Sequence, residues 1–127
     1  MNILIVDDKP NLARVTAVAL RTLGCHSLTA GSTAAANQVL ETVEIDAVFL
    51  DLNLNGEDGF VFLSELVARP KRVPIILFTA HSPDEIEKEA LRRGAFDCLF
   101  KPFTLDDLRR QLAKIEQYHK PHANNGV

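Results

Sequence analysis

Strand-like and helix-like segments alternate along this chain, and that alternation is the strongest constraint on its fold. Short apolar runs, several rich in β-branched residues, predict strands at 2–6, 26–30, 46–50, 74–78 and 97–100. Apolar residues at helical spacing predict helices at 10–23, 33–43, 59–68, 84–93 and 104–117. Strict alternation of this kind favours right-handed crossovers and a parallel sheet covered on both faces. We therefore expect one doubly wound α/β domain.

The same spacing predicts which side of each terminal helix is buried. In the first helix the expected core row is Leu12, Val15, Ala19, Leu20 and Leu23. Its expected exposed side carries Asn11, Arg14, Val18 and Arg21, with Ala13 and Ala17 between them. In the last helix the expected core row is Leu105, Leu108, Leu112 and Ile115.

Bulk properties exclude several classes of protein. A net charge of -3 does not indicate binding to nucleic acid or to a membrane surface. No apolar stretch approaches the roughly 20 residues of a membrane span, and the acidic start MNILIVDD is not a signal peptide. Cys25 and Cys98 fit no metal or redox spacing. We expect a cytoplasmic protein with one domain at 1–117 and a polar tail or linker start at 118–127.

Polar side chains follow four of the five predicted strands. They are Asp7 and Asp8 after the first, Asp51 and Asn53 after the third, Thr79 after the fourth and Lys101 after the fifth. Ligands of doubly wound sheets bind at the carboxyl ends of the strands, so these groups are expected to converge on one rim.

The chemistry of this rim indicates phosphoryl transfer. Three carboxylates close together repel, and a hard divalent cation such as Mg²⁺ relieves the repulsion. Lys101 supplies a movable positive charge for an anionic ligand, and Thr79 a hydroxyl. Asp51, beside both, is suited to attack phosphorus and form an acyl phosphate.

Each residue also has a purely structural interpretation. Asp7 and Asp8 would suit the start of the first helix, Asp51 a turn, Thr79 a helix cap and Lys101 the surface. His119 and His122 fit a polar tail better than a metal site. Joint placement at the strand ends favours the functional interpretation of the rim.

These residues identify a resemblance. Residues 1–115 resemble the receiver domain of bacterial two-component response regulators, through Asp7-Asp8, Asp51 in LDLNLNGEDGF, Thr79-Ala80 and Lys101-Pro102-Phe103. The resemblance implies a flavodoxin-like sheet with strand order 2-1-3-4-5.

The resemblance also implies a role for each site residue. Asp51 would accept a phosphoryl group from a histidine of a partner kinase or phosphotransfer protein, and Lys101 and the Ala80 backbone would contact that group. Asp8, Asp51 and the Asn53 carbonyl would bind Mg²⁺, with Asp7 assisting through water. The Lys101–Pro102 bond would be cis, and His81 and Asn53 would set the lifetime of the phosphorylated state.

Cys98 departs from the family pattern. The position three residues before the lysine usually holds Tyr or Phe, which turns inward when the site is phosphorylated. Strand alternation places Phe100 on the same face as Cys98, so Phe100 is a candidate to replace the missing aromatic residue.

Partner surfaces follow from the same resemblance. The first helix is expected to dock on a sensor histidine kinase or histidine phosphotransfer protein, although exposed aliphatic residues alone explain its surface equally well. The segments 84–93, 97–100 and 104–117 form the expected output surface and a possible homodimer face. No direct contact of this domain with nucleic acid or membrane is expected.

Three alternatives remain to be weighed against a phosphorylation switch. A flavin binder would need hydroxyl or glycine residues where Asp7 and Asp8 stand. A phosphatase of the haloacid type would need a second acid at Asn53. A degenerate receiver that only binds proteins is the closest rival, because of Cys98. The expected protein is therefore a signalling switch and not an enzyme beyond its own phosphorylation and dephosphorylation at Asp51.

Overall fold

The structure is a computed structural model that describes residues 1–54, 56–80 and 84–120. Its first half contains β1 (Asn2–Val6), α1 (Pro10–Thr22), β2 (His26–Ala30), α2 (Thr33–Thr42), β3 (Ala47–Asp51) and β4 (Asn53–Leu54). Its second half contains β5 (Glu57–Asp58), α3 (Gly59–Val67), β6 (Ile75–Thr79), α4 (Asp84–Arg92), β7 (Asp97–Phe100) and α5 (Leu105–His119). None of the described helices is long and apolar enough to cross a membrane.

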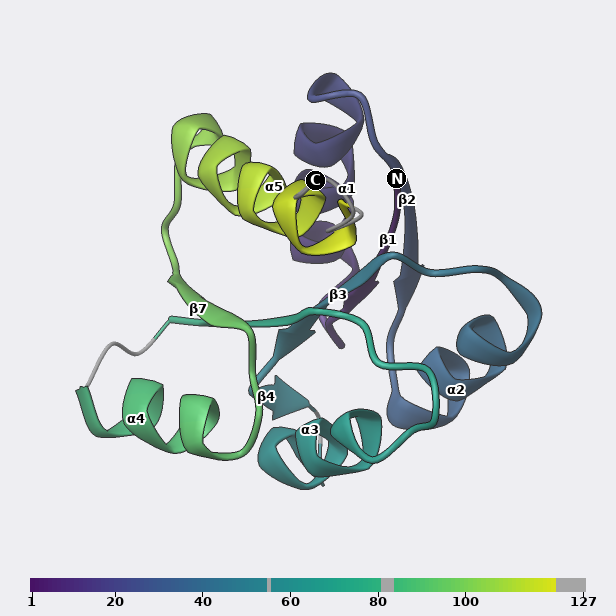
Figure 1. Cartoon of the computed structure of the whole chain (residues 1–127), viewed down its shortest axis with the longest axis vertical. Coiled ribbons are helices and arrows are strands. Elements are labelled where there is room, and N and C mark those ends of the chain that lie inside the picture. Colours follow the sequence, from purple (N-terminus) through teal and green to yellow (C-terminus); the bar gives the residue numbers. More distant parts are fainter. Residues whose placement is uncertain (55, 81–83, 121–127) are drawn as a thin grey trace, which may run out of the picture.

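Within the described residues, five strands form a parallel sheet in the order β2-β1-β3-β6-β7. Numbered along the chain without the short β4 and β5, this is the order 2-1-3-4-5, so the predicted fold is confirmed. Figure 1 shows α1 and α5 together on one face of the sheet and α2, α3 and α4 on the other. Two separate apolar clusters fill the two interfaces, as expected for a doubly wound sheet.

β3 and β6 have the predicted length but lie one residue farther along the chain than predicted. Asp51 is the last residue of β3 and Thr79 the last residue of β6. In the sheet register Asp51 lies opposite Phe78, and Thr79 lies opposite Phe100. Both polar residues are therefore held by the strand ladder itself, which restrains their backbones more than a loop would.

A short hairpin replaces the loop that was expected after β3. β4 and β5 pair antiparallel, with Asn53 opposite Asp58 and Leu54 opposite Glu57. Glu57 also accepts hydrogen bonds from the Thr33 amide (3.2 Å) and hydroxyl (2.8 Å), which ties the hairpin to the start of α2. Sequence patterns do not reveal this contact, because the two residues are distant along the chain and exposed.

The predicted core row of α1 was correct toward its C-terminal end, where Leu20 is fully buried, and wrong at its first two positions. Leu12 and Val15 are 44% and 66% exposed, whereas Ala13 and Ala17 are buried. Small side chains allow the helix to lie close against the sheet, and Thr16 joins this buried row because its hydroxyl donates to the Leu12 carbonyl (3.1 Å). Close packing therefore selected a row of small residues over the more apolar one.

The core row of α5 also needs correction at its first position. Leu105 is 44% exposed, and Gln111 is buried beside Leu112. Gln111 donates from Nε2 to Asp97 (3.0 Å), which partly compensates the burial of its amide.

The last helix extends past the predicted end of the domain at residue 117. Tyr118 packs edge-to-face on Phe96, with ring centroids 5.8 Å apart, and His119 donates from Nε2 to the Asp46 carbonyl (2.8 Å). These contacts explain why the helix continues to His119. Residues 121–127 of the predicted tail, including His122, lie outside the described residues.

Candidate functional site

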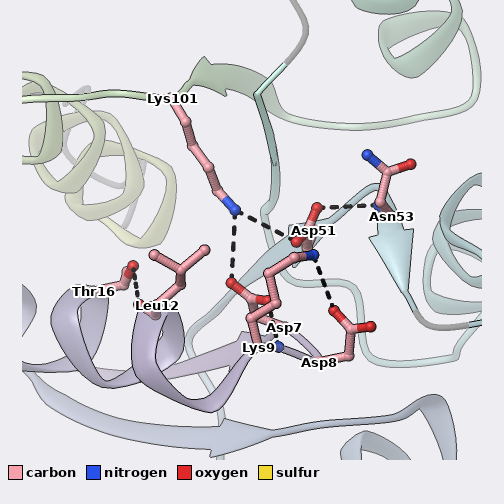
Figure 2. A network of polar contacts seen from close by, with 8 residues as sticks. All are labelled: Asp7, Asp8, Lys9, Leu12, Thr16, Asp51, Asn53 and Lys101. Atoms are coloured by element: carbon pink, nitrogen blue, oxygen red, sulfur yellow. Dashed lines mark hydrogen bonds and ion pairs between the residues drawn. The ribbon is translucent and has the colours of Figure 1, made fainter.

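The carboxyl ends of four neighbouring strands bring the predicted site residues to one rim. Side chains alternate along a strand, so Asp51 shares a face with Phe49, and Lys101 shares one with Leu99. Phe49 and Leu99 both belong to the apolar cluster under α1 and α5. The carboxylate of Asp51 and the ammonium of Lys101 therefore meet on that side of the sheet, as Figure 2 shows.

Three carboxylates meet at this point. Asp7, Asp8 and Asp51 each offer an oxygen atom, and these atoms lie within 4.8 Å of one another. Asp7 and Asp51 are each only 2% exposed, and Asp8 is half-buried. Lys101 Nζ lies 3.4 Å from Asp51 Oδ2 and 3.6 Å from Asp7 Oδ2, while Lys9 lies 3.4 Å from Asp8 (Figure 2).

Local backbone hydrogen bonds orient two of these carboxylates. The Lys9 amide donates to Asp7 Oδ1 (2.9 Å), and the Asn53 amide donates to Asp51 Oδ1 (3.0 Å). Each bond spans two residues, the spacing of an Asx turn. In both residues the second oxygen, Oδ2, is left to face Lys101.

The first helix does not depend on either aspartate as a cap. Its N-cap residue is Lys9, which makes no side-chain capping hydrogen bond, and Pro10 begins the helix. A proline at the first helical position removes one unsatisfied amide. The helix-cap interpretation of Asp7 and Asp8 is therefore wrong.

The donor set fits a hard divalent cation. All of its side-chain donors are carboxylate oxygens, the ligands that Mg²⁺ prefers. Asp7 Oδ2 is buried and accepts no hydrogen bond from the residues that the structure describes. A buried carboxylate oxygen without a hydrogen-bond donor is costly, and a bound cation would remove that cost.

Burial raises the pKa of Asp51 above its ordinary value of 3.8, and the nearby charge of Asp7 adds to the increase. The Asn53 amide and the Lys101 ammonium oppose this shift because both stabilise the carboxylate. The ionised Asp51 is thus less stable than an exposed aspartate, which leaves it in need of positive charge.

The residues of the expected switch lie on the opposite face of the sheet. Thr79 is fully buried at the end of β6, directly opposite Phe100 of β7, and Cys98 lies opposite Leu77. Cys98 is buried and Phe100 is half-buried against the cluster under α2, α3 and α4. Burial raises the pKa of the Cys98 thiol to about 11, so the thiol is neutral at physiological pH. The predicted shared face of Cys98 and Phe100 is confirmed.

The remaining predicted residues are placed as follows. Ala80 is exposed directly after Thr79, and the side chain of Asn53 is exposed on β4. The Lys101–Pro102 peptide bond is cis. His81 lies outside the described residues.

One residue at the rim was missed because it looked like ordinary core. Phe78 lies under Lys101, with Nζ 4.5 Å from the ring centroid. The sequence predicted Phe78 only as part of a strand. No sequence pattern indicates that a lysine following a different strand would extend over its ring.

Comparison with known proteins identifies the family of this arrangement. The family described as "Response regulator receiver domain" matches residues 3–113. The chain belongs to the response regulator receiver family.

The chain matches only a part of several longer regulators. This receiver chain is 41% identical over 108 residues to the regulatory protein AtoC of Escherichia coli, covering 84% of this chain and 23% of AtoC. It is 32% identical to the transcriptional regulatory protein KdpE of Staphylococcus aureus, covering 98% of this chain and 54% of KdpE. The chain thus spans about half or less of these relatives.

The fold agrees with an experimentally determined receiver domain. The crystal structure of the receiver domain of NtrX from Brucella abortus superimposes with a TM-score of 0.84 at 30% identity, over 91% of this chain and 98% of that one. The similarity therefore extends over nearly the whole domain.

The strained ionisation of Asp51 predicts a gain of stability on its neutralisation. A raised pKa means that the folded protein binds this proton more tightly than the unfolded chain does. The stability that protonated Asp51 contributes to the fold is fully present below the ordinary pKa and is lost as pH rises through the raised pKa. At pH 7 without divalent cations, Asp51→Asn should raise the free energy of unfolding by about 1 kcal/mol, or ~4 °C in melting temperature. Thermal unfolding followed by circular dichroism at pH 3 and pH 7 measures the effect.

The matched control is Asp106→Asn, which neutralises an exposed carboxylate on α5. It should change the free energy of unfolding by no more than about 0.5 kcal/mol at either pH. An Asp51→Asn variant less stable than the wild type at pH 7 would contradict the prediction.

Proposed function

We propose that this receiver domain is a phosphorylation-controlled switch in which Asp51 accepts a phosphoryl group from a histidine of a partner protein. The observation that carries the proposal is the Asp51 carboxylate, buried at the end of β3 and held between Lys101 and the acidic pair. An ionised nucleophile beside a fixed cation and a cluster of oxygen ligands is the arrangement that phosphoryl transfer requires.

The transfer needs no proton movement at Asp51, because the ionised carboxylate is itself the nucleophile. One of its oxygens forms a bond to phosphorus while the bond from phosphorus to the donor imidazole nitrogen breaks, and the electron pair stays on that nitrogen. Lys101 is close enough to Asp51 to neutralise the negative charge of the incoming group.

The acidic cluster would hold the metal of this reaction. Asp8 and Asp51 would bind Mg²⁺ directly, Asp7 mainly through water, and Asn53 through its backbone carbonyl. When bound, Mg²⁺ offsets the charge of the carboxylates and of the transferred phosphoryl group. The exposed Ala80, small in side chain, leaves the approach to Asp51 open, and its backbone would contact the phosphoryl group.

Incubation with Mg²⁺ and acetyl phosphate tests the proposal. The intact mass should increase by one phosphoryl group that is stable in acid and labile in base, as expected for an acyl phosphate. Asp51→Asn and a chelator should each abolish the gain. Mass spectrometry after removal of the donor gives the lifetime, which Asn53→Ala or His81→Ala should change if these residues control hydrolysis.

Absence of labelling under conditions in which a known receiver is fully phosphorylated would overturn the switch. The domain would then be a phosphorylation-independent binding module, the alternative that Cys98 favours. Labelling that persists in Asp51→Asn would instead place the acceptor on another residue.

The structural change caused by phosphorylation would be transmitted to α4 by Phe100 and not by Cys98. Phe100 lies directly opposite Thr79 in the β6–β7 register, on the face covered by α2, α3 and α4. Cys98 lies one step farther from the rim, opposite Leu77, and its small side chain has little to reorient. A movement of Thr79 toward the phosphoryl group would therefore reach the Phe100 ring first.

Substitution of the two candidates separates their roles. Phe100→Ala should remove most of the amide chemical-shift changes that phosphorylation causes in α4, because the ring that transmits the change is lost. Cys98→Ala should leave them in place. Two-dimensional NMR before and after phosphorylation measures both, and loss of the changes in Cys98→Ala alone would reverse the assignment.

The exposed side of α1 is proposed as the docking surface for the histidine donor. Leu12, Val15 and Val18 are 44%, 66% and 51% exposed. Single exposed aliphatic residues are common on protein surfaces, whereas these three lie together within two helical turns. Figure 2 shows that Leu12 lies near the acidic cluster. Leu12 and Val15, which the sequence had assigned to the core, thus enlarge the predicted docking face, and Arg14 and Arg21 line a surface pocket together with Val18.

A charged substitution on α1 should affect only protein donors. The test uses a phosphorylated histidine kinase that labels the wild-type protein. Val18→Glu should lower the rate of phosphotransfer from this kinase about tenfold, because the substitution buries an unpaired charge at the contact. The rate with acetyl phosphate should not change. The control is Val61→Glu on α3, since Val61 is equally exposed at 51%. An equal loss in both variants would remove α1 as the docking site.

The output of the domain would come from its last three elements. By analogy with the longer regulators that it resembles, α4, β7 and α5 would form the surface that contacts an output partner or a second copy. Sedimentation velocity with and without phosphorylation would detect such a dimer. The chain would carry no nucleic-acid or membrane contact of its own.

A further inference from the structure

We propose that Phe78 is a positioning residue that holds the Lys101 ammonium at the acceptor site through a cation–π contact. The proposal rests on the proposed function, since it concerns how Lys101 is presented to Asp51. It adds a residue to the site that contacts neither the phosphoryl group nor a metal.

The sheet order creates the need for such a residue. Lys101 follows β7, Asp51 ends β3, and β6 lies between these two strands. The Lys101 side chain must therefore cross the end of β6 to reach Asp51. In the register Phe78 of β6 lies opposite Asp51 on one side and Leu99 on the other, so its ring lies beneath that path.

The observed geometry matches a cation–π interaction. Lys101 Nζ lies 4.5 Å from the centroid of the Phe78 ring, within the roughly 6 Å over which this attraction acts. The Lys101 side chain is only 20% exposed, so water weakens the contact less than it would at the surface. The backbone amide of Lys101 also donates to the Thr79 carbonyl (2.8 Å), which fixes the start of the side chain.

The ring is itself rigidly held. Phe78 is fully buried, and it makes edge-to-face contacts with Phe49 on β3 and with Phe103 after β7, at centroid distances of 6.3 and 6.4 Å. Such pairs favour a fixed ring orientation. A rigid ring restricts a lysine side chain that would otherwise sample many rotamers.

In the described structure the Lys101 ammonium contacts Asp7, Asp51 and the ring of Phe78. Of these three contacts, only the one with the ring would be unchanged by the reaction. Asp7 and Asp51 lie 3.6 and 3.4 Å from Nζ, but cation binding and phosphorylation alter the charge around both carboxylates. The face of Phe78 keeps the same partial charge throughout. We therefore expect Phe78 to retain Lys101 near the acceptor while its carboxylate partners change.

Phe49 provides a matched control within the same cluster. It is fully buried on the neighbouring strand and packs against Phe78. Phe49→Leu and Phe78→Leu remove the same volume from the same core, so both should destabilise the fold similarly. The structure describes Lys101 stacking over Phe78 alone of these two rings.

An NMR experiment tests the contact without any phosphorylation. In the wild-type protein the Lys101 side-chain methylene protons should be shifted upfield by the ring current of Phe78. The shift should disappear in Phe78→Leu and persist in Phe49→Leu. Absence of an upfield shift in the wild type would overturn the proposal, whatever the outcome for the proposed function.

Kinetics test the consequence of the contact. The rate of labelling by acetyl phosphate at saturating Mg²⁺ should fall about fivefold in Phe78→Leu relative to Phe49→Leu. Equal rates, or equal losses in both variants, would show that Phe78 has only a packing role. Labelling that fails even in the wild type would refute the proposed function and leave the NMR result to decide the contact.

Fluorinated phenylalanine at position 78 covers the case in which Phe78→Leu does not fold. Stepwise fluorination weakens the negative face of the ring with little change of shape, so the labelling rate should fall with each fluorine. The same series at position 49 should have no effect on the rate. A rate independent of fluorination at position 78 would overturn the proposal.

Discussion

The site depends on the cost of placing two buried carboxylates beside each other. Asp7 and Asp51 are almost completely inaccessible, and in the described structure Lys101 is the cation that lies within 4 Å of both. One lysine between two carboxylates leaves net negative charge in a poorly solvated place. Burial, with the charge of Asp7 adding to it, accounts for the raised pKa of Asp51, and the excess of negative charge accounts for the fit of the cluster to a divalent cation. It also makes the position of Lys101 critical.

The parallel sheet separates the chemistry from its readout. Side chains of successive residues point to opposite faces, so Asp51 and Lys101 lie over the cluster under α1 and α5. Thr79 and Phe100 end neighbouring strands on the other face, beside α4 and its neighbours. A phosphoryl group on Asp51 would therefore act across the edge of the sheet: the donor would approach from the α1 side, and the response would reach the α4 side through the ends of β6 and β7.

Much of the site could be predicted because strand ends are visible in the sequence. The alternation of elements located the acidic pair, Asp51, Thr79 and Lys101 on one rim, and the structure brings the carboxylates and the lysine together. Helix faces were harder, since α1 buries Ala13 and Ala17 and exposes Leu12 and Val15. Hydrophobicity alone predicts the reverse, but close approach of a helix to a sheet requires small side chains.

By itself the sequence determined the order of elements, the parallel sheet and the residue types at the strand ends, because these depend on local periodicity and composition. Only the tertiary structure decided which groups touch. Two of these contacts join segments that are distant in the chain: the hydrogen bond between Glu57 and Thr33, and the stacking of Lys101 on Phe78. The side of α1 that stays exposed was likewise decided by how the helix packs on the sheet. Such contacts follow from strand order and packing distance, which no local pattern encodes.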